Sequence, residues 1–210
     1  MTDNPLLYRC EEKTLHHFPH AQDEIWLNVP KMHLVDTVTG DHPRLTSTAQ
    51  AFWSQSQQCI YFRFICEDDH VVATMTNHDD PIYNEDVVEV FLSETGSLQQ
   101  YKEFEVSPTN VKLDAFIRNI PSESLQVALE WHAEGWRTEI EQDPSRYVST
   151  WAIPFSNFEG GCPSRGDQWR MNCYRIDRGA NGNEDQYMAW SPTGAVNFHI
   201  SSKFGVLEFV

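Results

Sequence analysis

Two runs of alternating residues, joined by a loop rich in Ser and Gly, constrain the fold of this sequence more than any other feature. Residues 87–92 and 102–106 alternate in polarity and contain the β-branched and aromatic side chains that strands favour. The connecting segment 93–98 contains Gly96 and two serines, which suit a turn. The pattern therefore predicts a β-hairpin.

A turn centred near Ser97 places Glu89 opposite Glu105 in that hairpin. Like charges directly opposite each other destabilise a sheet, so this pair needs an Arg, a metal ion or the hydroxyls of a ligand beside it. If the two carboxyl groups are close and dry, at least one has a raised pKa. The alternative is that both point into water. One hairpin face also carries Glu103, and the other face is apolar and must be core: Val88, Val90, Leu92, Phe104 and Val106.

The composition limits the partners that the protein can have. With 15 basic and 31 acidic residues, the net charge is −16, which excludes nucleic acid and anionic membrane as main partners. No targeting segment and no run of eighteen apolar residues is present. The five cysteines are odd in number and show no CxxC spacing, which favours reduced thiols in a cytoplasm.

The remaining chain reads as nine or ten short strands without a sustained helical period. We therefore expect an all-β fold, an antiparallel sandwich of the jelly-roll kind, formed as one domain by residues 1–210. Residues 1–28 are expected to form an irregular leader that packs on it through Trp26. The other expected strands are 46–53, 59–66, 71–76, 111–117, 129–131, 135–137, 146–153, 168–176 and 204–209.

Recognised enzyme motifs are missing from the sequence: it has no GxxxxGK[ST], GxGxxG, HExxH or GxSxG. Four loop carboxylates could supply oxygen ligands for Ca²⁺, but their spacing is not that of an EF-hand, which favours ordinary turn carboxylates: Asp68, Asp69, Asp79 and Asp80. The clustered His16, His17 and His20 suit either a metal or a loop surface.

Two aromatic residues lie outside the alternating strands. Tyr83 precedes the hairpin, and Trp190 precedes a Ser-Pro pair that ends ladder pairing. We expect both rings to project from loops, where aromatic rings can stack on the apolar face of a sugar. The alternative is that each ring covers the end of a strand.

Seven segments, in order along the chain, resemble the family 9 carbohydrate-binding modules, particularly the stand-alone proteins called family 9-like: IYFRFICED (60–68), NEDVVEVFLS (84–93), YKEFEVSP (101–108), YVSTWAIPF (147–155), GDQWRMNCYRI (166–176), MAWSP (188–192) and SSKFGVLEF (201–209). The resemblance implies a β-sandwich without catalysis that binds sugar ends between two aromatic rings, often with structural Ca²⁺. It assigns the rings to Tyr83 and Trp190, a buried carboxylate to Glu89 and an amide to Asn172. At Glu105 the chain departs from it, because the sugar-binding members carry a basic residue there.

From these observations we predict a non-catalytic protein that binds a saccharide ligand. Tyr83 and Trp190 would stack on the sugar, while Glu89, Glu105 and Asn172 would hydrogen-bond it. Arg175 would join them only if a bulge turned it away from the face of Met171. Two alternatives stay open: a carbohydrate-active enzyme that uses Glu89 and Glu105 as paired carboxylates, and a module whose aromatic residues form a protein interface.

Overall fold

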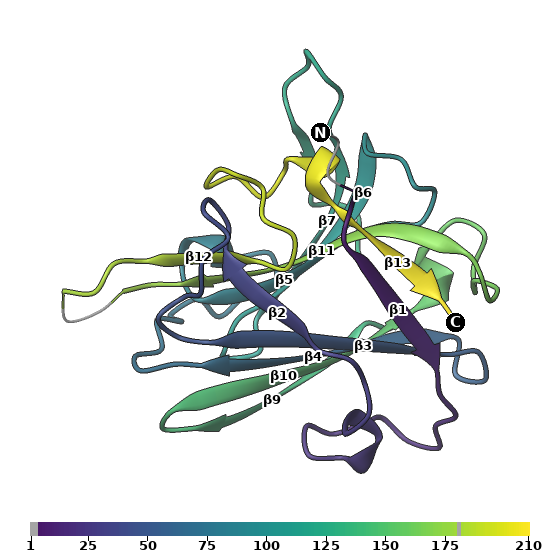
Figure 1. Ribbon diagram of the computed structural model, residues 1–210, viewed down its shortest axis with the longest axis horizontal. Helices are drawn as coiled ribbons and strands as arrows, with labels where there is room; N and C mark the ends of the chain where they lie inside the picture. Colours follow the sequence, from purple (N-terminus) through teal and green to yellow (C-terminus); the bar gives the residue numbers. More distant parts are fainter. Residues whose placement is uncertain (1–3, 180–181) are drawn as a thin grey trace.

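The computed structural model describes residues 4–179 and 182–210 (Figure 1). Within these ranges the protein is all-β, with thirteen strands and four 3₁₀ helices. The strands are β1 (Leu7–Glu12), β2 (Met32–Asp36), β3 (Ser47–Ser54), β4 (Cys59–Glu67), β5 (Val87–Ser93), β6 (Gln100–Val106), β7 (Lys112–Arg118), β8 (Gln126–Ala128), β9 (Arg137–Asp143), β10 (Arg146–Pro154), β11 (Gln168–Asp177), β12 (Gln186–Ala189) and β13 (Gly205–Phe209). The 3₁₀ helices are η1 (Glu24–Trp26), η2 (Ile82–Asn84), η3 (Phe155–Asn157) and η4 (Ser201–Lys203).

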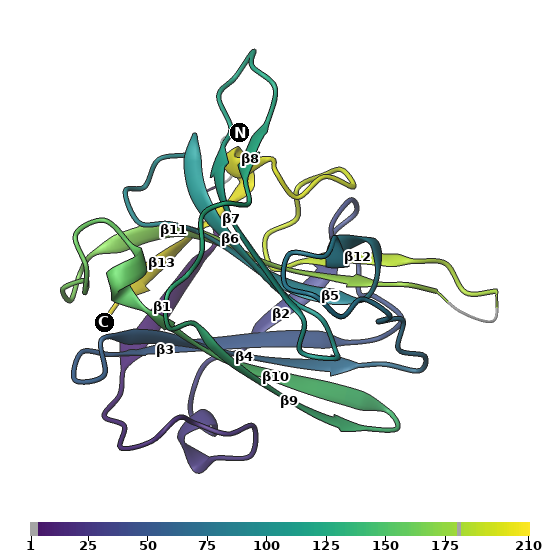
Figure 2. The ribbon, with the colours of Figure 1, turned by 180° about the vertical axis from the view of Figure 1, so that it is seen from behind.

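Six of the strands form a closed ring of hydrogen-bonded neighbours, in the order β11, β12, β2, β3, β1, β13 and back to β11. From β11 the sheet continues through β5, β6, β7 and β8, and from β3 it continues through β4, β10 and β9. Figure 2 shows these two extensions as separate layers that diverge from the ring. The arrangement is sandwich-like, but β1 and β2 hydrogen-bond the two layers to each other.

The main core fills the space between the two layers. Aromatic side chains of β4 and β10, including Phe64 and Trp151, meet the apolar face of the β5–β6 hairpin. Trp136 connects the layers, because its ring lies edge-on to both Phe104 and Trp151, with centroids 5.2 and 5.6 Å apart. Such rings combine a large buried area with a favourable edge-to-face geometry.

The register of the β5–β6 hairpin is the one predicted from sequence. Glu89 pairs with Glu105 and Val90 with Phe104. All five residues of the predicted apolar face are completely buried in the main core. The glutamate face therefore points away from the core, toward the outside of the layer.

A second apolar cluster lies on that outer face. It is formed by side chains of β5, β6, β7 and β11 together with Ile82, Phe198 and Phe204, which come from the segments that precede β5 and β13. The outer face of the hairpin is thus partly covered by two irregular segments, and the uncovered part forms the pocket described below.

Three sequence-based expectations about the fold were wrong. The leader is not wholly irregular, because β1 lies within it and pairs in parallel with both β13 and β3, so the pairing is not purely antiparallel. Residues 71–76 form no strand. The strands expected at 129–131 and 135–137 do not form there, and no hairpin joins them: β8 ends at Ala128 and pairs with β7, while β9 begins at Arg137 and pairs with β10. Trp26 is buried and connects the leader to the core as expected.

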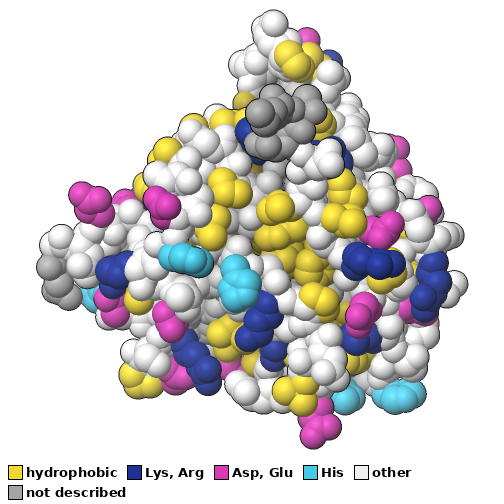
Figure 3. Space-filling view, viewed as in Figure 1, with side chains coloured by type: hydrophobic (Ala, Val, Ile, Leu, Met, Phe, Trp, Pro, Cys, Tyr) yellow, Lys and Arg dark blue, Asp and Glu magenta, His cyan; other side chains and the backbone are white. Residues whose placement is uncertain are grey.

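Figure 3 shows one face of the molecule, on which hydrophobic side chains gather in a band around β1 and β13. Lys, Arg, Asp and Glu side chains lie on both sides of this band, so the charges of this face are mixed rather than gathered in one acidic patch. All five cysteines are free thiols. Within the described residues, no helix has the length and apolar character needed to cross a membrane.

The expectation that the Trp190 ring projects from a loop was wrong. Its side chain belongs to the main core, is only 8% exposed and lies edge-on to Tyr8, with ring centroids 6.3 Å apart. The ring packs directly against the backbone of Gly205, where an added Cβ would lie 2.5 Å from Trp190 Cη2. Pro192 ends the strand pairing, but glycine at 205 provides the space into which the indole turns.

We therefore expect Trp190→Ala to lower the free energy of unfolding by about 3–5 kcal/mol, the usual cost of removing a core indole. The measurement is urea denaturation, with Leu27→Ala as a control because Leu27 is 77% exposed. A variant as stable as the wild type would show that this ring is not part of the core.

Candidate ligand-binding pocket

The pocket is a hollow of about 460 Å³ on the outer face of the β5–β6 hairpin. This volume lies within the range of roughly 300–1,000 Å³ that is typical of small-molecule sites. Its floor is made by Glu89 of β5 and by Glu103 and Glu105 of β6, which point to the same side because directly paired and alternate residues share a face. With one carboxylate oxygen taken from each glutamate, the three oxygens lie within 4.8 Å of one another.

Burial makes this floor electrostatically unusual. The three glutamates are 2%, 6% and 1% exposed, in chain order. Within the described part of the chain, the residues that line the pocket include no Lys or Arg. The Arg that was expected as one possible compensating group is therefore not among them, which leaves protons, a metal ion or a ligand to compensate the carboxyl groups.

The pKa of each floor glutamate is raised, chiefly by burial. Burial raises the pKa of Glu103 to about 7. The pKa of Glu89 and that of Glu105 are raised well above the usual value by burial, with the neighbouring carboxylates adding to the effect. Neither oxygen of Glu105 has a hydrogen-bond partner among the described residues when the group is a carboxylate. As a neutral acid, Glu105 can donate a hydrogen bond to Glu103, which raises its own pKa and lowers that of Glu103.

Aromatic and aliphatic side chains form the walls and rim. Tyr83 in η2 is 47% exposed at the rim, and Tyr187 of β12 lines the same pocket. Arg178 connects these two residues, because it donates hydrogen bonds to the carbonyl oxygen of Tyr83 (3.0 Å) and to the hydroxyl of Tyr187 (2.7 Å). The other apolar lining residues are Phe91, Leu113, Val127, Leu129, Ile176, Val196 and Phe198.

Phe198 and His199 line the pocket but were not predicted from sequence. The Phe198 ring stacks flat on Tyr174, with centroids 4.2 Å apart and planes 10° apart. His199 lies 2.8 Å (Nδ1) from the hydroxyl of Tyr101, and burial lowers its pKa to about 4, which keeps the imidazole neutral. In the sequence, Phe198 and His199 stand out only as two adjacent aromatic residues in a segment without periodicity. Trp190 was predicted as a binding residue because it also lies in such a segment.

Of the predicted binding residues, Tyr83, Glu89 and Glu105 come together in the pocket, whereas Trp190 lies in the core. Asn172 is on the same face of the sheet, opposite Phe91, but it is fully buried. Its amide donates a hydrogen bond to the Ser191 carbonyl (2.8 Å), and its Oδ1 accepts from the Ser191 amide (2.9 Å). Asn172 thus fixes the backbone beyond β12 and does not line the pocket.

Arg175 lies on the opposite face of β11, as simple alternation with Met171 requires, and no bulge turns it toward the pocket. It is completely buried and donates hydrogen bonds to Asp177 Oδ1 (2.7 Å) and Asp68 Oδ2 (3.1 Å). Its expected role in the pocket is therefore corrected: the guanidinium joins β11 to the end of β4.

The four candidate calcium ligands do not form one site. Asp68 joins the group just described, and Asp69 pairs with Arg44 (2.5 Å). Asp80 accepts hydrogen bonds from two backbone amides of its own loop. Asp79 lies beside two histidines, in a different part of the molecule.

Fold and pocket together define a β-sandwich-like ligand-binding domain. Residues 20–210 match the family described as "Carbohydrate family 9 binding domain-like", and the chain belongs to that family. A curated relative from Arthroderma benhamiae (strain ATCC MYA-4681 / CBS 112371), named "Extracellular protein", is 33% identical over 144 residues. The match covers 63% of this chain and 64% of that protein's length.

Solved structures have the same fold. A candidate carbohydrate-binding protein from Bacteroides uniformis ATCC 8492 superposes with a TM-score of 0.76 at 17% identity, covering 99% of both chains. A family 9 carbohydrate-binding module from Caldicellulosiruptor kristjanssonii in complex with cellotriose gives 0.72 at 14% identity, covering 97% of this chain and 93% of that one. The same module in complex with glucose gives 0.70 at 13% identity, covering 99% and 96%.

The raised pKa values predict how stability depends on pH. A carboxyl group whose pKa is raised on folding stabilises the protein fully below its unfolded pKa, about 4.3 for Glu, and this stabilisation is lost as the pH rises through the folded pKa. For Glu103 that loss begins near the unfolded pKa and is complete above about pH 7. We expect Glu105→Gln, which cannot ionise, to become progressively more stable than the wild type between pH 5 and pH 8, since the amide is neutral in both the folded and the unfolded chain whereas Glu105 must keep a proton to stay buried.

Thermal unfolding at several pH values measures this difference. Glu123→Gln is a suitable control, because Glu123 is exposed. A Glu105→Gln variant that loses stability relative to the wild type at every pH would mean that the carboxylate has a partner that stabilises its charge.

Proposed function

We propose that the protein binds carbohydrate in this pocket, without catalysis. The observation that carries the proposal is the buried trio of glutamates beneath a rim of aromatic side chains, with no Lys or Arg among the described lining residues. Membership of the family and the sugar complexes of the structurally similar module support it.

The floor suits hydroxyl groups. A neutral carboxylic acid has one O–H donor and further acceptor sites, as a sugar hydroxyl does, so each of the two can satisfy the other. Glu105 lacks a hydrogen-bond partner as a carboxylate, and a ligand hydroxyl would supply one. Because the three glutamates are buried, such hydrogen bonds are stronger than they would be at an open surface.

The rim suits the apolar face of a sugar ring. Tyr83 and Tyr187 present rings at the mouth, and Phe198 replaces Trp190 as an aromatic residue of the wall in this proposal. Asn172 and Trp190 would act indirectly, by fixing the backbone and the core behind the pocket.

Charge narrows the class of saccharide. Because the pKa of Glu103 is about 7, this floor group is partly ionised at neutral pH, and its negative charge disfavours uronates and sulfated or sialylated sugars. We therefore propose a neutral saccharide, with an amino sugar as the charged type that the floor would also accept.

The enzyme alternative is disfavoured by the direction of the glutamates. Catalytic carboxyl pairs of glycosidases flank the scissile bond, so that one protonates the leaving oxygen while the other acts from elsewhere around the sugar. Glu89 and Glu105 are direct cross-strand partners and rise side by side from one floor. They would face a bound sugar from the same side.

We also propose that the protein can hold a structural calcium ion. Two buried groups offer the oxygen donors that Ca²⁺ prefers: the three floor glutamates, and a second group formed by Asp68, Asp86 and Asp177. Arg175 already donates to two carboxylates of the second group, so an ion there would share them with a fixed positive charge.

The first functional prediction concerns Tyr83. Because its ring is exposed at the rim, Tyr83→Ala should leave the melting temperature nearly unchanged while weakening saccharide binding by roughly tenfold, the upper range for one aromatic contact. Binding is measured on a panel of neutral, amino and acidic saccharides, with Leu27→Ala as the exposed control. If the wild type binds no neutral or amino saccharide on the panel, the proposed function is wrong.

The second functional prediction concerns Glu105. Replacing it by leucine removes a buried group that lacks a partner as a carboxylate and must hold a proton, at the cost of the hydrogen bond that the neutral acid can donate to Glu103, so at neutral pH Glu105→Leu should be at least as stable as the wild type. The same change removes a hydroxyl-binding group from the floor and should abolish measurable saccharide binding. Calorimetry of unfolding measures the stability of this variant, and calorimetry of binding measures its saccharide affinity. Full saccharide affinity in Glu105→Leu would show that the ligand does not reach the floor.

A further inference from the structure

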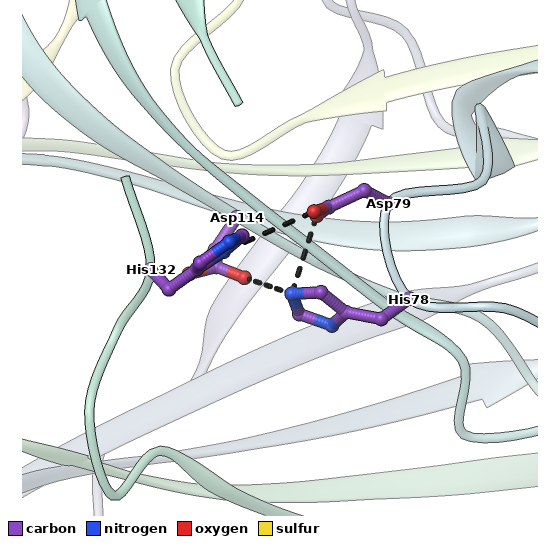
Figure 4. A group of neighbouring side chains, drawn as sticks. All are labelled: His78, Asp79, Asp114 and His132. Carbon is purple, nitrogen blue, oxygen red and sulfur yellow. Dashed lines mark ion pairs between the residues drawn. The ribbon is translucent and has the colours of Figure 1, made fainter. Parts of the chain in front are cut away.

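Three segments of the chain bring two imidazoles and two carboxylates together on the side of β7 that faces away from the pocket (Figure 4). His78 and Asp79 come from the loop before η2, Asp114 from β7, and His132 from the segment between β8 and β9. Each offers one donor atom, and these atoms all lie within 4.8 Å of one another. We propose that these four residues bind a divalent transition-metal ion, with Zn²⁺ the best fit.

The distances suit a single ion. His78 Nε2 lies 2.9 Å from Asp114 Oδ1 and 3.3 Å from Asp79 Oδ1. His132 Nδ1 lies 3.8 Å from Asp79 Oδ2 and 3.9 Å from Asp114 Oδ2. These four distances involve both oxygens of each carboxylate. With one oxygen from each, the four donor atoms lie within 4.8 Å of one another, close to the spacing of about 3.4 Å between donors in a tetrahedral zinc site with bonds of about 2.1 Å.

A buried carboxylate oxygen points into the cluster without a hydrogen bond. Asp114 is 1% exposed, and its Oδ2 accepts a hydrogen bond from the amide of Ala133. Its Oδ1 has no hydrogen-bond partner among the described residues and is directed at the His78 imidazole, as is the similarly unpartnered Oδ1 of Asp79. A buried carboxylate is normally paired or bound to a metal, so this oxygen is an independent sign of a ligand.

The backbone around the cluster is already fixed. The amide of Asp79 donates to the Lys112 carbonyl (3.0 Å), which ties the loop to the start of β7. Asp80 accepts hydrogen bonds from the amides of Thr76 and Asn77 and closes that loop. The bond from Ala133 to Asp114 brings the His132 segment to the same strand. The donors are therefore positioned without the ion.

The donor types select the metal. Two imidazole nitrogens with two carboxylate oxygens suit Zn²⁺ and its neighbours in the first transition row, whereas Ca²⁺ takes six to eight oxygen ligands. The histidine side chains are 45% and 55% exposed, so an ion can enter from solvent. The site is distinct from the buried Asp68, Asp86 and Asp177 group, which has no imidazole.

The test is titration of the full chain with ZnCl₂ after removal of metals with EDTA. We expect one saturable site per chain, a rise in melting temperature with Zn²⁺ that equal CaCl₂ does not produce, and a visible spectrum typical of tetrahedral Co²⁺ when Co²⁺ is used. His78→Gln and His132→Gln should each weaken Zn²⁺ binding at least tenfold. Both side chains are largely exposed, so these variants should fold.

The exposed pair His17 and His20, whose rings are 6.3 Å apart, supplies the matched control. The double variant His17→Gln/His20→Gln should bind Zn²⁺ as the wild type does. If that variant loses the site while His132→Gln keeps it, or if the wild type shows no saturable Zn²⁺ binding, the proposal is wrong and the cluster is only an ion-pair network. Neither result depends on whether the pocket binds a saccharide.

Discussion

The pairing of Glu89 with Glu105 across the β5–β6 hairpin fixes most of what is distinctive in this protein. Side chains alternate between the two faces of a sheet, so a shift of one residue would exchange the whole apolar set with the glutamates. The register that puts Val90 and Phe104 in the main core is therefore also the one that puts three carboxyl groups on the outer face. It continues into β7, where Phe104 pairs with Asp114 and directs that carboxylate to the other side of the strand.

A floor of this kind is not explained by stability. Three buried carboxyl groups without a cation can be accommodated only if some of them hold protons, which is the physical meaning of their raised pKa values. Hydrophobic side chains at the same positions would pack against Phe91 and Leu113 without that cost. The pairing of Glu89 with Glu105 breaks the rule that like charges do not face each other across a sheet, whereas nearly all of the hairpin follows the local rules of pairing. Such exceptions concentrate at functional sites.

The sequence alone predicted those parts that depend on local patterns. Alternation and turn residues predicted the hairpin, its register, its core face and two residues of the floor. Tyr83 was identified because it lies outside every predicted strand. Trp190 satisfied the same argument as Tyr83, but its ring direction is set by Gly205, fifteen positions further along the chain. Phe198 was missed because its segment has no period. Its place depends on Tyr174, whose ring stacks on it and whose hydroxyl donates a hydrogen bond to its carbonyl oxygen (2.8 Å). These contacts are tertiary, and no local signal encodes them.

The pocket and the histidine cluster lie on opposite sides of one strand. Leu113 of β7 lines the pocket, and the next residue, Asp114, belongs to the cluster. The segment before η2 and the segment between β8 and β9 contribute to both: Tyr83 follows Asp79 by four residues, and Leu129 precedes His132 by three. These segments lack strand pairing of their own, so their order depends on the few contacts that hold them to β7. The rim of the pocket is therefore positioned by polar contacts behind the sheet, while its floor is positioned by the ladder itself.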